Sequence, residues 1–297
     1  MQNGAAVEVR TMVVAGRTLE VATLGDPAGD TVVMHHGSPG EAASVSLLAP
    51  LAVDGFFLMS VSRPGYGAST RREGRRVADV VEDVDAVLDV LGRSTYQSVG
   101  WSGGGPHSLA CAVLDATRCV GAWSLAGVAP TDVDFDWTAG MAPENVAEFA
   151  LAREGGPAYE AHLATIGAAF AGATAHDVVD LFGELLTPVD QAALADEARR
   201  EELAASCRRA FAHGIGGFLD DDRSFFAPWG FDVADATVPV SIWYGDCDAM
   251  VPPTHGAWLA AHAAHATVVH RPDEGHVSLV VNHLDDLSAA LRVGRDH

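Results

Sequence analysis

The stretch VGWSGGGP at residues 99–106 decides the fold. A short, partly β-branched run precedes it, and a segment with an apolar helical face follows it. The sequence therefore predicts a buried strand, a sharp turn and a helix, with Ser102 at the corner. Such a corner is strained, and neighbouring turns pass so closely that side chains at Gly100 and Gly104 would collide.

The pattern Gly-x-Ser-x-Gly around Ser102 is typical of a nucleophile elbow. A strand that turns abruptly into a helix holds its corner hydroxyl in the open at the carboxyl edge of a sheet. The free N–H groups and the dipole of the new helix favour negative charge there. A glycine-rich turn alone would give the same pattern, so the prediction depends on the rest of the chain.

The composition excludes several classes of function. The formal net charge of the 297 residues is -22, from 40 acidic and 18 basic side chains, which disfavours nucleic acid and anionic membranes as partners. All 18 basic residues are arginine. The chain therefore has no lysine for Schiff-base chemistry, for pyridoxal phosphate or for a phosphate-binding loop.

Cysteine usage and the chain start predict a cytoplasmic protein. The four cysteines are scattered, which favours free thiols over a disulfide framework or a zinc site. Residues 1–8 lack a basic region followed by an apolar run, so we expect no signal peptide. No apolar stretch is long enough to span a bilayer. We expect no cofactor.

Apolar strands alternate with helices in the first part of the chain, after a hairpin whose turn lies at 15–17. This alternation predicts an α/β fold, a mostly parallel sheet with helices on both faces. The expected strands are 7–14, 18–24, 31–34, 56–61, 96–99 and 119–125, and the expected helices are 41–52, 77–91 and 108–114.

Residues 131–226 form a helical insertion that is too long for a loop. The expected helices there are 143–154, 158–170, 175–186 and 189–211. The alternation of strands and helices then resumes. The expected strands are 238–244 and 266–270, and the expected helices are 254–264 and 277–291. Residues 1–130 and 227–297 therefore form one α/β core that the insertion interrupts.

A serine nucleophile needs a base, and the base needs a carboxylate to orient it. In a parallel sheet such groups gather on loops at the carboxyl ends of the strands. Asp246 and Asp248 both follow the strand at 238–244, and His276 follows the strand at 266–270. The chain order serine, aspartate, histidine is the order of an α/β-hydrolase triad, with either aspartate as the acid.

Five motifs in the expected order at the expected strand ends resemble the α/β-hydrolase superfamily, over nearly the whole chain except the insertion. They are HHGSPG at 35–40, SRPGYGAS at 62–69, GWSGGG at 100–105, YGDCDAMVP at 244–252 and DEGH at 273–276. The resemblance implies that Asp248 is the acid, that His276 is the base and that the insertion is a cap over the pocket.

The backbone N–H groups of Gly103 and, by resemblance, of Ser38 are the expected oxyanion hole. His36 and Gly37 are expected to support that loop, as Gly100 and Gly104 support the elbow. Because the adjacent His35 and His36 point to opposite faces of a strand, we expect no metal site there.

Other side chains have a structural interpretation beside a functional one. We expect Trp101 to serve packing, and the cap aromatics to be mostly cap core. The arginines of the loop before residue 77 are expected to be solvated: Arg71, Arg72, Arg75 and Arg76. Five glutamates of the insertion fit either a helix surface or a site for an amino group: Glu144, Glu148, Glu154, Glu160 and Glu184.

These observations predict a serine hydrolase that cleaves carboxylic esters of small or medium size through an acyl-enzyme. Alternatives within the superfamily are a proline-iminopeptidase-like aminopeptidase and a carbon–carbon bond hydrolase. An alternative of another class is a non-catalytic receptor that uses the same pocket. We expect a small-molecule substrate, and the sequence gives no indication of the oligomeric state.

Overall fold

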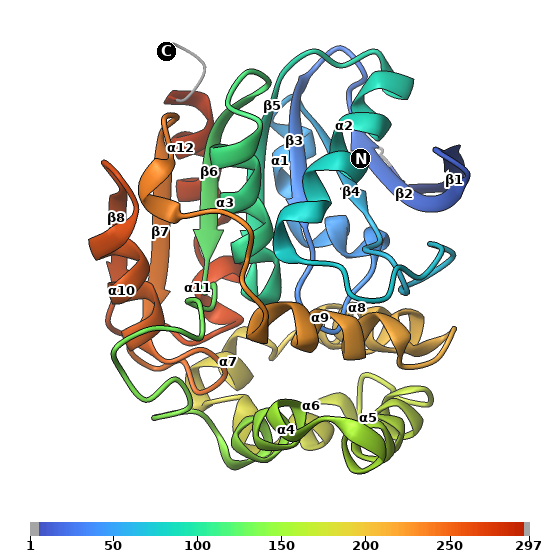
Figure 1. Ribbon diagram of the computed structural model, residues 1–297, viewed down its shortest axis with the longest axis vertical. Helices are drawn as coiled ribbons and strands as arrows, with labels where there is room; N and C mark the ends of the chain where they lie inside the picture. Colours follow the sequence, from blue (N-terminus) through green and yellow to red (C-terminus); the bar gives the residue numbers. More distant parts are fainter. Residues whose placement is uncertain (1–5, 294–297) are drawn as a thin grey trace.

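The computed structural model describes residues 6–293, and its centre is an eight-stranded sheet (Figure 1). The strand order is β1-β2-β4-β3-β5-β6-β7-β8. β1 and β2 pair antiparallel, as do β2 and β4, and all other pairs are parallel. The strands are β1 (Glu8–Val14), β2 (Arg17–Gly25), β3 (Asp30–His35), β4 (Phe56–Val61), β5 (Tyr96–Trp101), β6 (Cys119–Leu125), β7 (Val240–Gly245) and β8 (Thr267–Arg271).

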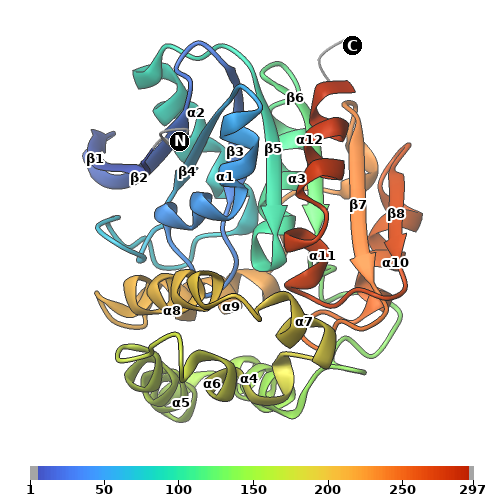
Figure 2. The ribbon, with the colours of Figure 1, turned by 180° about the vertical axis from the view of Figure 1, so that it is seen from behind.

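Helices cover both faces of the sheet, because the central strands are apolar on both sides. In β3, Val33 packs in the cluster that contains α2, α3 and α10, whereas Val32 and Met34 pack in the cluster of α1, α11 and α12. Figure 2 shows the second group in front of the strands. The helices are α1 (Ala49–Val53), α2 (Val80–Leu91), α3 (Gly105–Leu114), α10 (Pro253–His262), α11 (Ser278–Val281) and α12 (Leu284–Val293).

Six further helices lie together beyond the carboxyl ends of the parallel strands (Figures 1 and 2). Two of them, α8 and α9, run next to the sheet edge, while α4, α5 and α6 lie farther away. Their bounds are α4 (Pro143–Glu154), α5 (Gly156–Phe170), α6 (Val178–Phe182), α7 (Pro188–Ala193), α8 (Glu197–Phe211) and α9 (Gly216–Phe226). The loops that carry the predicted site residues end against this layer.

Four predicted helices are wrong in extent. The helix expected at 189–211 is two helices, because Asp196 accepts hydrogen bonds from the N–H groups of Ala198 and Arg199 and begins α8. The other three are also divided or shortened. Residues 42–48 form a 3₁₀ helix before α1, residues 175–186 contain only α6 and a 3₁₀ turn at 183–185, and residues 277–291 contain α11 and α12.

Helix α9 was not predicted from the sequence. It begins with Gly216 and Gly217 and carries three consecutive aspartates, residues that have low helix propensity. All three aspartates are buried, so tertiary partners compensate for the poor local sequence.

The expected fold class, a mostly parallel α/β sheet with helices on both faces, is confirmed. All four cysteines are free thiols, as expected. Within residues 6–293, no helix has the length and apolar character that a bilayer span requires. Residues 1–5, part of the segment considered for a signal peptide, lie outside the described residues.

Candidate active site

Ser102 lies at the turn between β5 and α3 with a φ of +57°, in the left-handed region. The turn allows no side chain on either flank. A Cβ at Gly100 would lie 2.1 Å from the carbonyl oxygen of Gly104, and a Cβ at Gly104 would lie 2.1 Å from that of His35. The two glycines therefore make the close passage of backbone possible, and the strained serine sits at the carboxyl edge of the sheet.

His276 and Asp248 come from the loops after β8 and β7 and meet beside this turn. The Nδ1 atom of His276 lies 2.8 Å from Oδ2 of Asp248, and both residues are buried. The second carboxylate oxygen, Oδ1, accepts the N–H groups of Met250 and Val251, each at 2.8 Å. Because Asp248 accepts, Nδ1 of His276 carries the proton and Nε2 is left as an acceptor.

The other carboxylate of the β7 loop, Asp246, lies at the surface. Its Oδ1 atom is 2.7 Å from Nε2 of His270, and about half of the Asp246 side chain is exposed. The structure therefore brings Asp248, and not Asp246, next to His276.

Opposing effects act on the pKa of His276. Burial disfavours the imidazolium, but the charge of Asp248 and its hydrogen bond favour it, and the charge of Asp190 adds to them. The net result is a pKa above the usual value of histidine. The imidazole is therefore prepared to accept a proton although it has almost no contact with solvent.

The loop after β3 lies against the serine turn. A Cβ at Gly37 would lie 3.4 Å from the Cβ of Ser102, and a Cβ at Gly103 would lie 2.4 Å from Oγ of Ser38. The peptide bond between Ser38 and Pro39 is cis. The backbone of Ser38 and the first turn after Ser102 thus line the same space.

His36 supports this loop through both nitrogens of its ring. Its Nδ1 atom lies 2.8 Å from the carbonyl oxygen of Gly37, and its Nε2 atom accepts the backbone N–H of Arg63 at 3.2 Å. Burial and the charge of Arg63 hold the pKa of His36 well below its ordinary value, so the ring is neutral. The adjacent His35 points elsewhere, and its Nε2 lies 3.0 Å from Oγ of Ser98.

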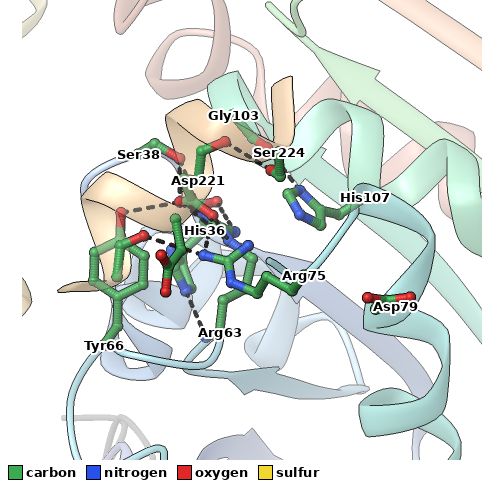
Figure 3. A network of polar contacts seen from close by, with 12 residues as sticks. His36, Ser38, Arg63, Tyr66, Arg75, Asp79, Gly103, His107, Asp221 and Ser224 are labelled. Atoms are coloured by element: carbon green, nitrogen blue, oxygen red, sulfur yellow. Dashed lines mark hydrogen bonds and ion pairs between the residues drawn. The ribbon is translucent and has the colours of Figure 1, made fainter. Parts of the chain in front are cut away.

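The carboxylate of Asp221, on α9, joins this loop to the helical layer (Figure 3). It accepts hydrogen bonds from Arg63 (Nε at 2.9 Å and Nη2 at 2.6 Å), from Arg75 (Nη2 at 2.6 Å) and from the hydroxyl of Tyr66 at 2.9 Å. The hydroxyl of Ser38 also donates to it. One buried carboxylate thus holds side chains from the loops after β3 and β4.

The two arginines keep Asp221 ionised. Burial alone would raise its pKa, but the charges of Arg63 and Arg75 lower the pKa well below the usual range. The expectation that Arg75 is solvated was wrong, because its side chain is 3% exposed and pairs with a carboxylate 146 residues later. By contrast, Arg72 and Arg76 keep substantial exposure.

Three cavities with shared lining residues lie near the serine turn. The central one, about 60 Å³, is lined by Ser102 and His276. It shares Ser102 with a cavity of about 160 Å³ toward α4, α5 and α9, and Trp101 with an apolar cavity of about 260 Å³ toward α8 and α12. Trp101 therefore lines two cavities, beyond the packing role expected of it, and its Nε1 donates to the carbonyl oxygen of His276 at 3.1 Å.

The cavity of about 160 Å³ has aromatic walls and an acidic end. Glu148 and Asp222 line it, and both are more than nine-tenths buried. Burial raises the pKa of each carboxyl, and Tyr159 donates a hydrogen bond to Asp222. Aromatic side chains of the helical layer supply the apolar wall: Phe149, Phe170, Phe182, Phe218 and Phe225. Three other aromatic residues of the layer, Tyr159, Phe211 and Phe226, do not line this cavity.

Sequence reasoning missed Asp221 and Asp222. The only signal for them was a run of three aspartates inside a segment that is otherwise rich in aromatic residues. The five glutamates of the insertion do not behave alike, since only Glu148 is buried. Among residues 6–293, no cluster of three or more histidine, cysteine or acidic side chains is arranged to hold a metal ion.

A family model described as the alpha/beta hydrolase fold matches residues 30–283. A search of curated proteins found no match. Among solved structures, an alpha/beta hydrolase fold protein from Nakamurella multipartita is 24% identical, with a TM-score of 0.66 over 97% of this chain and 100% of that chain.

Two further solved structures carry names that mention a reaction. An enol-lactonase from Burkholderia xenovorans is 18% identical, with a TM-score of 0.64 over 97% of this chain and 100% of its own. An esterase from a Rhodococcus species is 18% identical, with a TM-score of 0.67 over 96% of this chain and 99% of its own. At these identities the likeness shows a shared fold.

The Asp221 network yields a stability prediction. We expect Asp221→Asn to lower the free energy of unfolding by about 3–5 kcal/mol, because it leaves two buried guanidinium groups without their counter-charge. Urea unfolding followed by circular dichroism measures the change. Glu82→Gln, which removes one of the two acidic partners of the partly exposed Arg72, is the control and should cost less than about 1 kcal/mol. Equal losses in both variants would contradict the assigned role.

Proposed function

This chain belongs to the alpha/beta hydrolase family, and from that premise we propose that it is a serine hydrolase that cleaves carboxylic esters through an acyl-enzyme. The observation that carries the proposal is the cavity that Ser102 and His276 share, together with the hydrogen bond from His276 to Asp248. These are the residue types that nucleophilic acyl transfer requires, in the chain order typical of this fold.

In the proposed reaction, the Oγ atom of Ser102 attacks the carbonyl carbon of the ester while Nε2 of His276 takes its proton. The tetrahedral intermediate collapses, and the imidazolium gives that proton to the departing alkoxide. Water then attacks the acyl-enzyme with His276 as the base and releases the acid and the free serine. Asp248 holds the tautomer and stabilises the imidazolium in both halves.

The negative charge of the intermediate needs preorganised donors. We propose the backbone N–H groups of Gly103 and Ser38 for this role. Gly103 lies in the first turn after the nucleophile, where N–H groups have no partner within the helix. Ser38 lies against Gly103, and Asp221 holds its side chain. Loss of one such donor costs about 10²–10³-fold in rate in known enzymes.

We propose residues 131–226 as the cap of this hydrolase. Its helices supply the aromatic wall and the acidic end of the cavity beside Ser102. A cavity of about 160 Å³ that Ser102 lines, and one of about 260 Å³ that the adjacent Trp101 lines, fit a substrate of small or medium size with an apolar portion.

A second candidate function is supported by Glu148 and Asp222. Two buried carboxylates at the end of the cavity favour a substrate with a cationic nitrogen, as in a peptide or ester with a free amino terminus. Glu148 has no hydrogen bond or ion pair within residues 6–293, so a ligand would supply its partner. An aminopeptidase of the proline-iminopeptidase kind would use the same serine.

The nucleophile is tested by labelling. We expect Ser102→Ala to abolish both labelling by a fluorophosphonate probe and hydrolysis of p-nitrophenyl butyrate, because the variant lacks the proposed nucleophile. The far-UV circular dichroism should not change. The exposed Ser94→Ala is the control and should keep both activities. Labelling of Ser102 without turnover of ester and peptide panels would favour the ligand-binding receptor.

The acid is tested by a pair of substitutions in one loop. Asp248→Asn should lower kcat about 10⁴-fold, since the amide cannot hold the required tautomer of His276; this is the magnitude known for the same change in a serine protease. Asp246→Asn, which touches only the exposed His270, should leave kcat within a small factor. The p-nitrophenyl butyrate assay measures both, and the reverse order of effects would reassign the acid.

The second candidate is tested by comparing alanine p-nitrophenyl ester with its N-acetyl form. If the acidic end binds an amino group, the free amine should have a kcat/KM at least about tenfold higher, equivalent to about 1.4 kcal/mol. Glu148→Gln should remove this preference, whereas Glu154→Gln, an exposed site on the same helix, should keep it. Equal rates for the two esters in the unsubstituted protein would rule the candidate out.

A further inference from the structure

A second cap carboxylate, Asp190 on α7, lies directly against the histidine loop. It is fully buried, and its Oδ2 atom accepts the backbone N–H of His276 at 3.2 Å. Its Oδ1 atom accepts the N–H groups of Val277 at 2.8 Å and Ser278 at 2.9 Å. Together the two oxygens accept three consecutive backbone N–H groups, at residues 276–278. These residues lie 86 to 88 positions after Asp190 in the sequence.

The surroundings of Asp190 are shaped for this contact. A Cβ at Gly275 would lie 2.5 Å from Oδ2 of Asp190, so the glycine admits the carboxylate. The hydroxyl of Thr187 donates to the same oxygen at 3.0 Å and holds the carboxylate from the cap side. Within residues 6–293 no arginine or histidine forms an ion pair with Asp190. Its negative charge therefore faces the histidine loop without a neighbouring cation.

We propose that Asp190 is a positioning residue for His276, one that fixes the histidine loop from the cap and makes the imidazole a stronger base through its charge. The inference rests on the proposed function, because it assigns Asp190 a role only if His276 acts as the base. The proposed cap would then position the catalytic base through Asp190, in addition to lining the substrate cavity.

Electrostatics support the second half of the proposal. The charges that act on the His276 imidazole are those of Asp248, from the loop after β7, and of Asp190, from α7, whose carboxylate binds the backbone N–H of His276. Trp101 packs on a further side, with its ring centroid 5.4 Å away, and carries no charge. Burial lowers the pKa of His276, while the charges of Asp248 and then Asp190 raise it. In this buried setting a carboxylate acts over several ångströms with little screening.

The two effects proposed for Asp190, fixing the loop and acting on the imidazole through its charge, would change the pH dependence of the rate differently. If Asp190 only held the loop in place, its loss would lower the rate at every pH equally. If its charge also acts on the imidazole, its loss lowers the pKa of His276, and the acidic limb of the rate profile moves to lower pH. The sign follows because the neutral imidazole is the active base, and a lower pKa keeps it neutral down to a lower pH.

The experiment measures the rate at which a rhodamine-linked fluorophosphonate labels Ser102 between pH 4 and pH 9. For Asp190→Asn we expect a lower plateau rate and a midpoint about half to one pH unit below that of the unsubstituted protein. Asp196→Asn is the matched control. Asp196 also accepts backbone N–H groups in the cap, but it is exposed and begins α8, so neither plateau nor midpoint should change.

A folded Asp190→Asn protein, verified by circular dichroism, whose midpoint equals that of the unsubstituted protein would overturn the inference. If that variant does not fold, Gly275→Ala tests the contact from the other side, since its Cβ displaces the carboxylate without removing the charge. We expect labelling at least about tenfold slower, and labelling at the original rate would also overturn it. Absence of labelling in the unsubstituted protein would instead remove the proposed function.

Discussion

A carboxylate can stay ionised in the protein interior only where cations or N–H donors surround it, and Asp221 meets this condition through Arg63 and Arg75. The same arginine, Arg63, also donates to the carbonyl oxygens of His36 and Gly37 at 2.6 and 2.8 Å. The loop after β3, the loop after β4 and helix α9 therefore cannot move independently. Moving α9 away would leave two buried guanidinium groups without a counter-charge, which costs several kcal/mol.

This constraint adds a structural role to the helices of residues 131–226, which we propose as a cap. Asp221 of α9 holds the loop that carries Ser38, and Asp190 of α7 holds the loop that carries His276. Glu148 of α4 and Asp222 of α9 line the cavity that we propose for the substrate. The helical layer therefore contacts the loops of Ser38 and His276 through Asp221 and Asp190, and it lines the cavity through Glu148 and Asp222.

The sequence predicts the elements whose causes are local. Glycines at 100 and 104 specify the turn at Ser102, and the parallel strand pattern brings the loops of Asp248 and His276 to one edge. The roles of Asp190 and Asp221 could not be predicted, because their partners lie more than 80 positions away and leave no periodic pattern. For the same reason Arg75 was expected to be a solvated loop residue, and α9 was not predicted.

Asp221 and Asp222 illustrate how strongly the surroundings decide the behaviour of identical residues. They are neighbours on α9, and both are buried. Asp221 faces two arginines, which lower its pKa, whereas Asp222 faces Tyr159 and Glu148 at the cavity, where burial raises its pKa. Successive helical residues point about 100° apart. Asp221 therefore binds the two arginines, whereas Asp222 lines the cavity. The arginine network of Asp221 and the cavity lined by Asp222 are thereby coupled through a single helical turn, so a substitution that tilts α9 changes both together.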